Sequence, residues 1–328
     1  GRQQIVSGKK SIVLSPDFFY AIIQNMQQKY IRGALFMNTI WSDYVQGIGT
    51  LYSSRVLRFS DDVKYKYIKA FMLEEKKKIL EIGCGPGALG EALSRWYPDA
   101  LITGVDRDSN FIEFANKKAP HISFLEGDAA DLPFENESFD AAISNTVAEH
   151  IKPSEFYKEQ YRVLKEGGVC LVLSARKGII VNAPCIMEQT DFEKNIWQRT
   201  KKFYDDIFCK NRVCAYPQNE AEIPANMEKY GFRNVTTEYI TINLTPDNPN
   251  NSRETAYAMI DSLRQGKLDN AEALKNIEGE AAVEPWEIEE LKRLINEKYN
   301  KRLELYDKGV KQWDTHVYVT MRVRGVKQ

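Results

Sequence analysis

KKKILEIGCGPGALG, residues 76–90, is the stretch that decides the fold of this chain. A short apolar run ends at Glu81, a glycine-rich loop follows, and a sequence typical of a helix begins at Ala88. A strand, a glycine turn and a helix in this order bring backbone N–H groups and a helix N-terminus close to a nucleotide-like ligand. Glycine suits such a loop because the missing Cβ permits positive φ angles and close approach of the ligand. The stretch therefore predicts an α/β protein with a ligand at this loop.

The spacing Gly83-x-Gly85-x-x-Ala88 matches the dinucleotide fingerprint G-x-G-x-x-G/A, so NAD is one candidate ligand. An NAD-dependent oxidoreductase also needs a second mononucleotide-binding half and a catalytic residue beside the nicotinamide. The sequence indicates neither feature. The fingerprint alone is weak, because a glycine loop after a strand is often a plain tight turn.

Three acidic residues at the ends of successive predicted strands favour another ligand. Glu81 lies two residues before the first glycine, where a carboxylate could face a cationic group. Asp106 ends the run ALITGVD, where a carboxylate can accept both hydroxyls of an adenosine ribose. Asp128 follows the next strand in ISFLEGDAADLPF, in a position to accept from an adenine amino group.

This set, E-x-G-x-G-x-G, an acid ending the second strand, then GDA and LPF, resembles motifs I to III of the class I S-adenosylmethionine-dependent methyltransferases. SFDAAISNTVAEHI and YRVLKEGGVCLVLS follow in the order of that family's fourth- and fifth-strand units. The resemblance covers about residues 76–178 and is specific as a set. The LPF and EHI segments resemble the ubiquinone/menaquinone-type branch of small-molecule methyltransferases.

The resemblance implies S-adenosyl-L-methionine as the cofactor and roles for residues of the loop, the strand ends and the N-terminal segment. These cofactor-binding residues are Glu81, Gly83, Gly85, Gly87, Asp106, Arg107, Asp128, Ala129, Asn145, Tyr52 and Arg55. Asn145 is expected near the methionine moiety. Tyr52 and Arg55 either cover the cofactor or form a salt bridge with its carboxylate, and the alternative is a plain helix-surface pair. No metal site is expected.

Methyl transfer asks little covalent chemistry of a protein, which must hold a nucleophile in line and, where needed, remove its proton. His150, in AEHI after the fourth strand, is the histidine nearest the expected transfer point. An imidazole with an ordinary pKa of about 6.5 can accept a proton at neutral pH. Glu149 is a second catalytic candidate. Many methyltransferases need no base, and a purely structural histidine is the alternative.

Composition narrows the function further. The chain has 328 residues, 45 of them basic and 46 acidic, with no long basic block, which argues against a nucleic-acid partner. No apolar run approaches the roughly 20 residues that span a bilayer. Five scattered cysteines are too few for a disulfide framework and indicate a reduced, cytoplasmic protein. A small molecule is therefore the expected acceptor.

Strands expected at 78–82, 101–105, 122–125, 139–144 and 169–174 alternate with helices expected near 87–96, 109–118, 127–131 and 154–165. This alternation predicts an α/β fold, a doubly wound and mostly parallel sheet. The resemblance adds a sixth strand within VTTEYITINL and a closing strand at 316–325, which makes a seven-stranded sheet. Asp108 or Ser109 is a candidate N-cap for the helix that follows the second strand.

Residues 1–75 are expected to form an N-terminal helical segment that acts as a lid, and 76–328 a methyltransferase domain with helical insertions at about 179–220 and 246–315. Aromatic residues, costly to leave in water, would roof the acceptor pocket: Phe18, Phe19, Tyr20, Trp197, Phe203 and Tyr204. The alternative is that these aromatics join one insertion to another.

The leading hypothesis is methyl transfer from S-adenosylmethionine to a small molecule by in-line displacement. One alternative is the NAD-dependent oxidoreductase, and another is a cofactor-binding protein without turnover whose insertions bind a protein partner.

Overall fold

The structure is a computed structural model that describes residues 41–175, 181–183, 189–210, 212–277, 279 and 282–328. The lid prediction for residues 1–40, including Phe18, Phe19 and Tyr20, lies outside these residues. Among the helices described, none is both long and apolar enough to cross a membrane.

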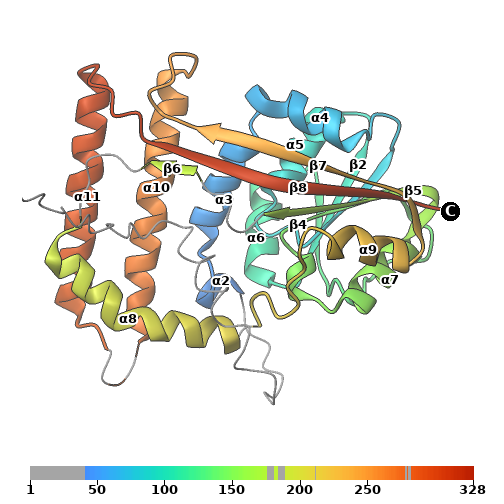
Figure 1. Ribbon diagram of the computed structural model, residues 1–328, viewed down its shortest axis with the longest axis horizontal. Coiled ribbons are helices and arrows are strands. Elements are labelled where there is room, and N and C mark those ends of the chain that lie inside the picture. The colour runs from blue at the N-terminus through green and yellow to red at the C-terminus, as the bar shows by residue number, and fades with distance from the viewer. Residues whose placement is uncertain (1–40, 176–180, 184–188, 211, 278, 280–281) are drawn as a thin grey trace, which may run out of the picture.

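The sheet runs in the order β3-β2-β1-β4-β5-β8-β6, and β7 pairs with β8 (Figure 1). Its strands are β1 (Lys78–Ile82), β2 (Leu101–Asp106), β3 (Ser123–Glu126), β4 (Phe139–Asn145), β5 (Leu164–Ala175), β6 (Val181–Ala183), β7 (Phe232–Leu244) and β8 (Thr315–Lys327). Strands β1 to β5 are parallel. Chain order reverses between β1 and β4, and ligands of open α/β sheets bind at such a switch point.

The mixed α/β sheet agrees with the predicted fold class, but two details differ. All seven predicted strands occur, and the short β6 adds another, antiparallel to β8, inside the segment predicted as helical. β6 can pair with β8 because β8 extends past the end of β5, so residues 315–317 of β8 are not paired with β5. The helix predicted near 127–131 was wrong: this stretch is a turn in which Asp128 Oδ1 accepts from Ala130 N at 2.8 Å.

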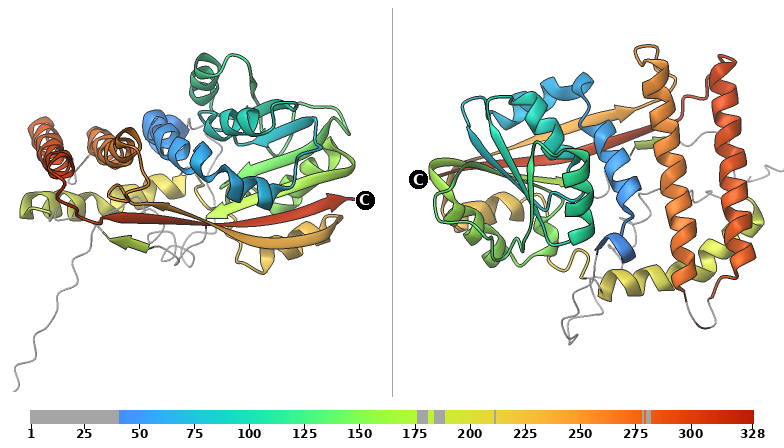
Figure 2. Two further views of the ribbon diagram at one scale, coloured as in Figure 1. Left: turned by 90° about the horizontal axis from the view of Figure 1, so that it is seen from above. Right: turned by 180° about the vertical axis from the view of Figure 1, so that it is seen from behind.

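Helices cover both faces of the sheet because its strands bury alternate side chains on opposite sides. On one face α4 (Lys64–Phe71), α5 (Ala88–Trp96) and α6 (Ser109–Lys118) pack against residues such as Ile79 and Leu171. On the other, α7 (Pro153–Val163) and α9 (Glu222–Lys229) pack against Leu80 and Cys170. Figure 2 shows the two layers on opposite sides of the sheet.

A separate helical group lies beyond the carboxyl ends of the parallel strands (Figure 1). It consists of α8 (Asp191–Lys210), α10 (Arg253–Ala273) and α11 (Pro285–Asp307), which share an apolar core around Ile196, Ile260 and Leu291. Helix α3 (Ile48–Arg58) packs on α10 and lies between this group and the sheet. The sheet edge and the helical group therefore enclose a space over the switch point.

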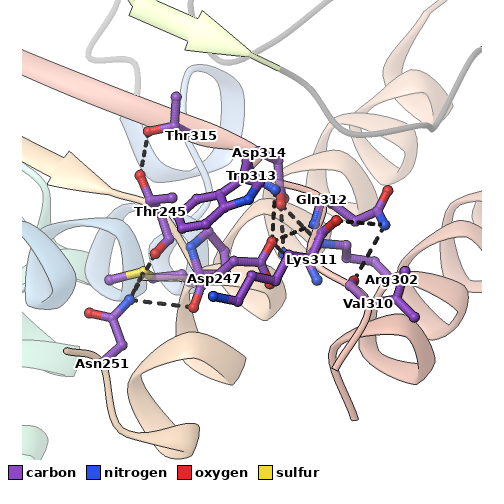
Figure 3. A network of polar contacts seen from close by, with 12 residues as sticks. Thr245, Asp247, Asn251, Arg302, Val310, Lys311, Gln312, Trp313, Asp314 and Thr315 are labelled. Carbon is purple, nitrogen blue, oxygen red and sulfur yellow. Dashed lines mark hydrogen bonds and ion pairs between the residues drawn. The ribbon is translucent and has the colours of Figure 1, made fainter. Parts of the chain in front are cut away.

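A buried ionic network fixes α11 to the sheet (Figure 3). Arg302, only 1% exposed, donates through Nη2 to Asp314 at 2.6 Å and to Asp247 at 2.9 Å. Asp247 also accepts from the backbone N of Gln312 and Trp313 at 2.7 and 2.8 Å. Asp247 follows β7 and Asp314 precedes β8, so one guanidinium joins the two longest strands to the helical group.

Candidate functional site

A cavity of about 690 Å³ lies over the carboxyl ends of β1, β2, β4 and β5. Its walls come from the glycine loop, the turn after β3, α3, α10 and the start of β8. This volume lies within the range of about 300–1,000 Å³ that is usual for ligand pockets.

The glycine loop between β1 and α5 has the conformation that its sequence predicts. Gly83 and Gly87 have φ of 65° and 86°, which few residues with a side chain adopt. A Cβ on Gly83 would lie 2.4 Å from Val147 Cγ2, and a Cβ on Gly87 would lie 2.9 Å from the Phe124 ring. Gly87 is also the N-cap position of α5, so a helix N-terminus points toward the cavity.

Glu81 is the last residue but one of β1, beneath this loop, and lines the cavity. The residue is 2% exposed, and its Oε2 has no hydrogen-bond partner among the residues described. Burial raises the pKa of the carboxyl well above its ordinary value, and the charge of Asp106 raises the pKa further. An isolated buried carboxylate is costly, so this position suits a cationic ligand group.

Asp106 ends β2 and is held by the backbone around it. Its Oδ2 accepts from Gly85 N at 2.8 Å and its Oδ1 from Asp108 N at 3.0 Å. Burial raises the pKa of Asp106 even though both hydrogen bonds lower it. Because each oxygen has a second lone pair, the carboxylate can still accept from a diol in the cavity.

Two neighbours of Asp106 connect the site to the N-terminal segment. Asp108, one of the two N-cap candidates in the sequence, caps α6 by accepting from the backbone N of Asn110 and Phe111. It also accepts from Ser42 N at 2.6 Å, which fixes the short helix α2 (Trp41–Tyr44) over the site. Arg107 lines the cavity, with its guanidinium 5.7 Å from the centre of the Trp41 ring.

Asp128 and Ala129, in the turn after β3, line the same cavity at the end reached by Asp106. One carboxylate oxygen of Asp128 is engaged by Ala130 N, and the side chain is exposed. The other oxygen is available to a donor on a ligand.

Asn145 and Arg55 meet the cavity near the end of β4, whereas Tyr52 does not. Asn145 is the last residue of β4 and lines the cavity. Arg55, on α3, lines it as well and donates through Nη2 to Thr146 Oγ1 at 3.2 Å. Tyr52 turns away, donating its hydroxyl to Glu91 Oε1 at 2.9 Å, and does not line the cavity. Gly87 is the other predicted site residue that does not line it.

His150 and Glu149 both line the cavity after β4. His150 Nδ1 accepts from the backbone N of Cys214 at 2.8 Å, and its ring lies edge-on to Trp41 at 4.9 Å between centroids. Because Nδ1 accepts a hydrogen bond, the proton of the neutral ring is assigned to Nε2. A ring in this state is better suited to donate a hydrogen bond to a ligand than to act as a base. Oε2 of Glu149 is buried, and no group in the described structure bonds to it.

The second insertion, rather than the first, supplies the helix that walls the cavity. Leu263, Gly266 and Asp269 of α10 are lining residues. Trp197 and Phe203 of α8 instead pack in the apolar core shared with α10 and α11, which corrects the expectation that they roof the pocket. The side chain of Tyr204 lies outside the described residues.

Sequence reasoning missed the lining residues Arg58 and Tyr318. Arg58 lies three residues after Arg55, on the same face of α3, and this spacing is the one signal that could have found it. Tyr318 gives no such signal, because it comes from the distant strand β8.

Comparison with known proteins agrees with this geometry. The family described as "Methyltransferase domain" matches residues 80–172. The fatty-acid O-methyltransferase of Mycolicibacterium smegmatis is 39% identical over 106 residues, 31% of this chain and 38% of that protein. The demethylmenaquinone methyltransferase of Chlorobaculum tepidum is 29% identical over 152 residues, 45% of this chain and 62% of that protein.

Among solved structures, the phosphoethanolamine N-methyltransferase 2 of Haemonchus contortus superposes with a TM-score of 0.50 at 16% identity. That match covers 90% of this chain and 60% of the other, and it shows a shared fold. The chain spans less than two thirds of the length of these curated relatives. The motifs, the sheet and the matched family together show that the chain contains a class I, S-adenosylmethionine-dependent methyltransferase domain.

Proposed function

We propose that this protein transfers a methyl group from S-adenosylmethionine to a small-molecule acceptor by direct in-line displacement. The observation that carries the proposal is the convergence of Glu81, Asp106 and Asp128 on one cavity. Glu81 lies near the end of β1, Asp106 ends β2 and Asp128 lies in the turn after β3. These three strands are neighbours in the sheet, and the glycine loop lies beside their ends.

Each of these groups suits one part of the cofactor. The Glu81 carboxylate, whose Oε2 has no partner in the described structure, would face the ammonium group, and Asp106 would accept the ribose hydroxyls. Asp128 and the backbone of Ala129 would bind the adenine. Arg55, which has a neutral partner in Thr146, would bind the cofactor's carboxylate. The bound cofactor supplies an electrophilic methyl group, so the remaining work is orientation and proton transfer.

For the proton, the geometry supports a division of roles between two neighbouring residues. His150 would donate a hydrogen bond through Nε2 and orient the acceptor, because Nδ1 is engaged by Cys214 N. Glu149, whose Oε2 has no partner in the described structure, is the better candidate to accept a proton. An acceptor that needs no deprotonation would make Glu149 dispensable.

The names of the sequence relatives support a small-molecule acceptor, since they refer to a fatty acid and to demethylmenaquinone. The sheet supports this cofactor over NAD. After β5 it continues with the antiparallel strands β8 and β7 instead of a second parallel mononucleotide-binding half in the described residues.

The deciding experiment measures the melting temperature of the protein with S-adenosylhomocysteine and, separately, with NADH. A ligand that binds only the native state at 100 times its Kd stabilises by about 2.7 kcal/mol, a readily measured shift. We expect the shift with S-adenosylhomocysteine alone. A shift with NADH alone would establish the oxidoreductase alternative. Binding without methyl transfer to any acceptor screened would favour the cofactor-binding protein.

A further inference from the structure

Arg58, at the C-terminal end of α3, is a buried cation that faces the cavity. The residue is 9% exposed. Its guanidinium lies 4.4 Å from the centre of the Tyr318 ring, and its Nε donates to Ser54 O at 3.4 Å. In the part of the chain that the structure describes, no carboxylate pairs with it. Both terminal nitrogens, with four of its five N–H donors, therefore remain for a ligand.

Three acidic residues, one close to Arg58 in the chain and two on the α10 wall of the cavity, are engaged by other groups. Asp61, the acidic residue closest to it along the chain, accepts from Trp96 Nε1 at 2.8 Å and pairs with Arg95. Asp269, on the facing wall of the cavity, accepts from Thr50 and from Gln265. Glu272, one turn further along α10, pairs with Lys275 and Lys292.

Apolar side chains are among those that line the cavity with Arg58. Phe59, Leu263 and Val319 line the cavity with Tyr318. A guanidinium is costly to bury without an anion, and stacking on an aromatic ring leaves its edge exposed in a planar fork. That fork matches the two oxygens of a carboxylate or phosphate.

We propose that Arg58 binds an oxyanion group, a carboxylate or a phosphate, carried by the methyl acceptor. The inference rests on the proposed function and narrows its substrate class to anionic molecules with an apolar part. Arg55 lies one turn earlier on the same face of α3, beside Thr146 and the end of β4. Arg55 therefore serves the cofactor side of the cavity, and Arg58 serves the acceptor side, next to β8.

The test is calorimetry on the full chain saturated with S-adenosylhomocysteine, with four probes of equal chain length: octanoate, octyl phosphate, octanol and octylamine. A charge-assisted hydrogen bond strengthens binding by about 10- to 100-fold. We expect octanoate or octyl phosphate to bind at least about tenfold more tightly than octanol and octylamine. The stronger of the two anions identifies a carboxylate or a phosphate acceptor.

Arg58→Met removes the guanidinium that lies over Tyr318 but keeps an unbranched side chain, and it should abolish this preference, whereas Arg58→Lys should retain part of it. Arg95→Met is the matched control, because Arg95 forms an exposed ion pair and does not line the cavity. It should leave the preference unchanged.

Equal affinity for octanol and both anions, or a preference that survives in Arg58→Met, would overturn the inference. A loss of affinity for S-adenosylhomocysteine in Arg58→Met would also overturn it, by assigning Arg58 to the cofactor. A parent protein that does not bind S-adenosylhomocysteine at all would instead reject the proposed function.

Discussion

Replacing Glu81 by glutamine should make the ligand-free protein more stable and the cofactor bind more weakly. Glutamine preserves the shape of this side chain and removes its charge. In the structure the carboxyl is 2% exposed and its Oε2 has no partner among the residues described. Its pKa is raised well above 4.5 by burial and by the charge of Asp106.

The sign of the pH dependence follows from proton binding. Between 4.5 and the raised pKa, the folded protein holds a proton on Glu81 that the unfolded chain has released. Stability therefore falls as pH rises through this interval, by about 1.4 kcal/mol per pH unit for one proton. Glu81→Gln lacks this loss. Its advantage over the parent should begin near pH 4.5, grow at that slope, and become constant above the raised pKa.

Urea denaturation of both proteins in steps from about pH 4 to pH 8 measures this difference. Lys275 and Lys292 lower the pKa of Glu272 to about 2. Carboxyls of this kind make the folded protein less stable as pH falls. They do so in both proteins and cancel in the comparison. Titration with S-adenosylhomocysteine provides the second measurement, since losing a charge-assisted contact to an ammonium group should weaken binding about tenfold or more. A stability difference that stays flat with pH, or an unchanged affinity, would refute the reasoning.

Three further predictions concern the site and the helical group. Asp106→Ala should weaken S-adenosylhomocysteine binding about tenfold or more, because it removes a charged acceptor, and an unchanged affinity in calorimetry would exclude Asp106 from the site. His150→Ala should lower turnover of a methylated acceptor by clearly less than the roughly 10²–10⁴ expected for a general base, and a larger loss in initial-rate measurements would restore His150 as the base. Arg302→Met should lower the free energy of unfolding in urea by about 3–5 kcal/mol, because it leaves two buried carboxylates without a partner. The control Arg293→Met removes an exposed ion pair and should cost less than about 1 kcal/mol. Similar losses in the two variants would contradict this account.

Features encoded within a few residues of one another were predictable from the chain alone. The glycine loop, the acids at the ends of β1 and β2 and the Asp108 cap each depend on local backbone geometry, and alternating strands and helices then bring the strand ends to one edge. The turn at 127–131 was mistaken for a helix because the Asp128 side chain competes for the backbone N–H of Ala130.

Contacts between distant segments could not be predicted in this way. Nothing near His150 in sequence indicates that Cys214 N donates to its Nδ1, although this bond assigns the proton of the neutral ring to Nε2. The place of β6 depends on how far β8 extends past β5. The sequence also does not show whether α8 or α10 walls the cavity, because this depends on α10, and not α8, packing on α3 in the described part of the chain.

The residues of this chain thus encode its cofactor cradle locally, because a glycine turn and the acid before it are neighbours in sequence. The position of Arg58 on the proposed acceptor side depends on the tertiary structure. Arg58 meets Tyr318 because β8, paired with β5, lies next to α3, and α10 packs on the same helix. The guanidinium is buried and shielded from water only in the tertiary structure. Its unpaired charge is costly for that reason.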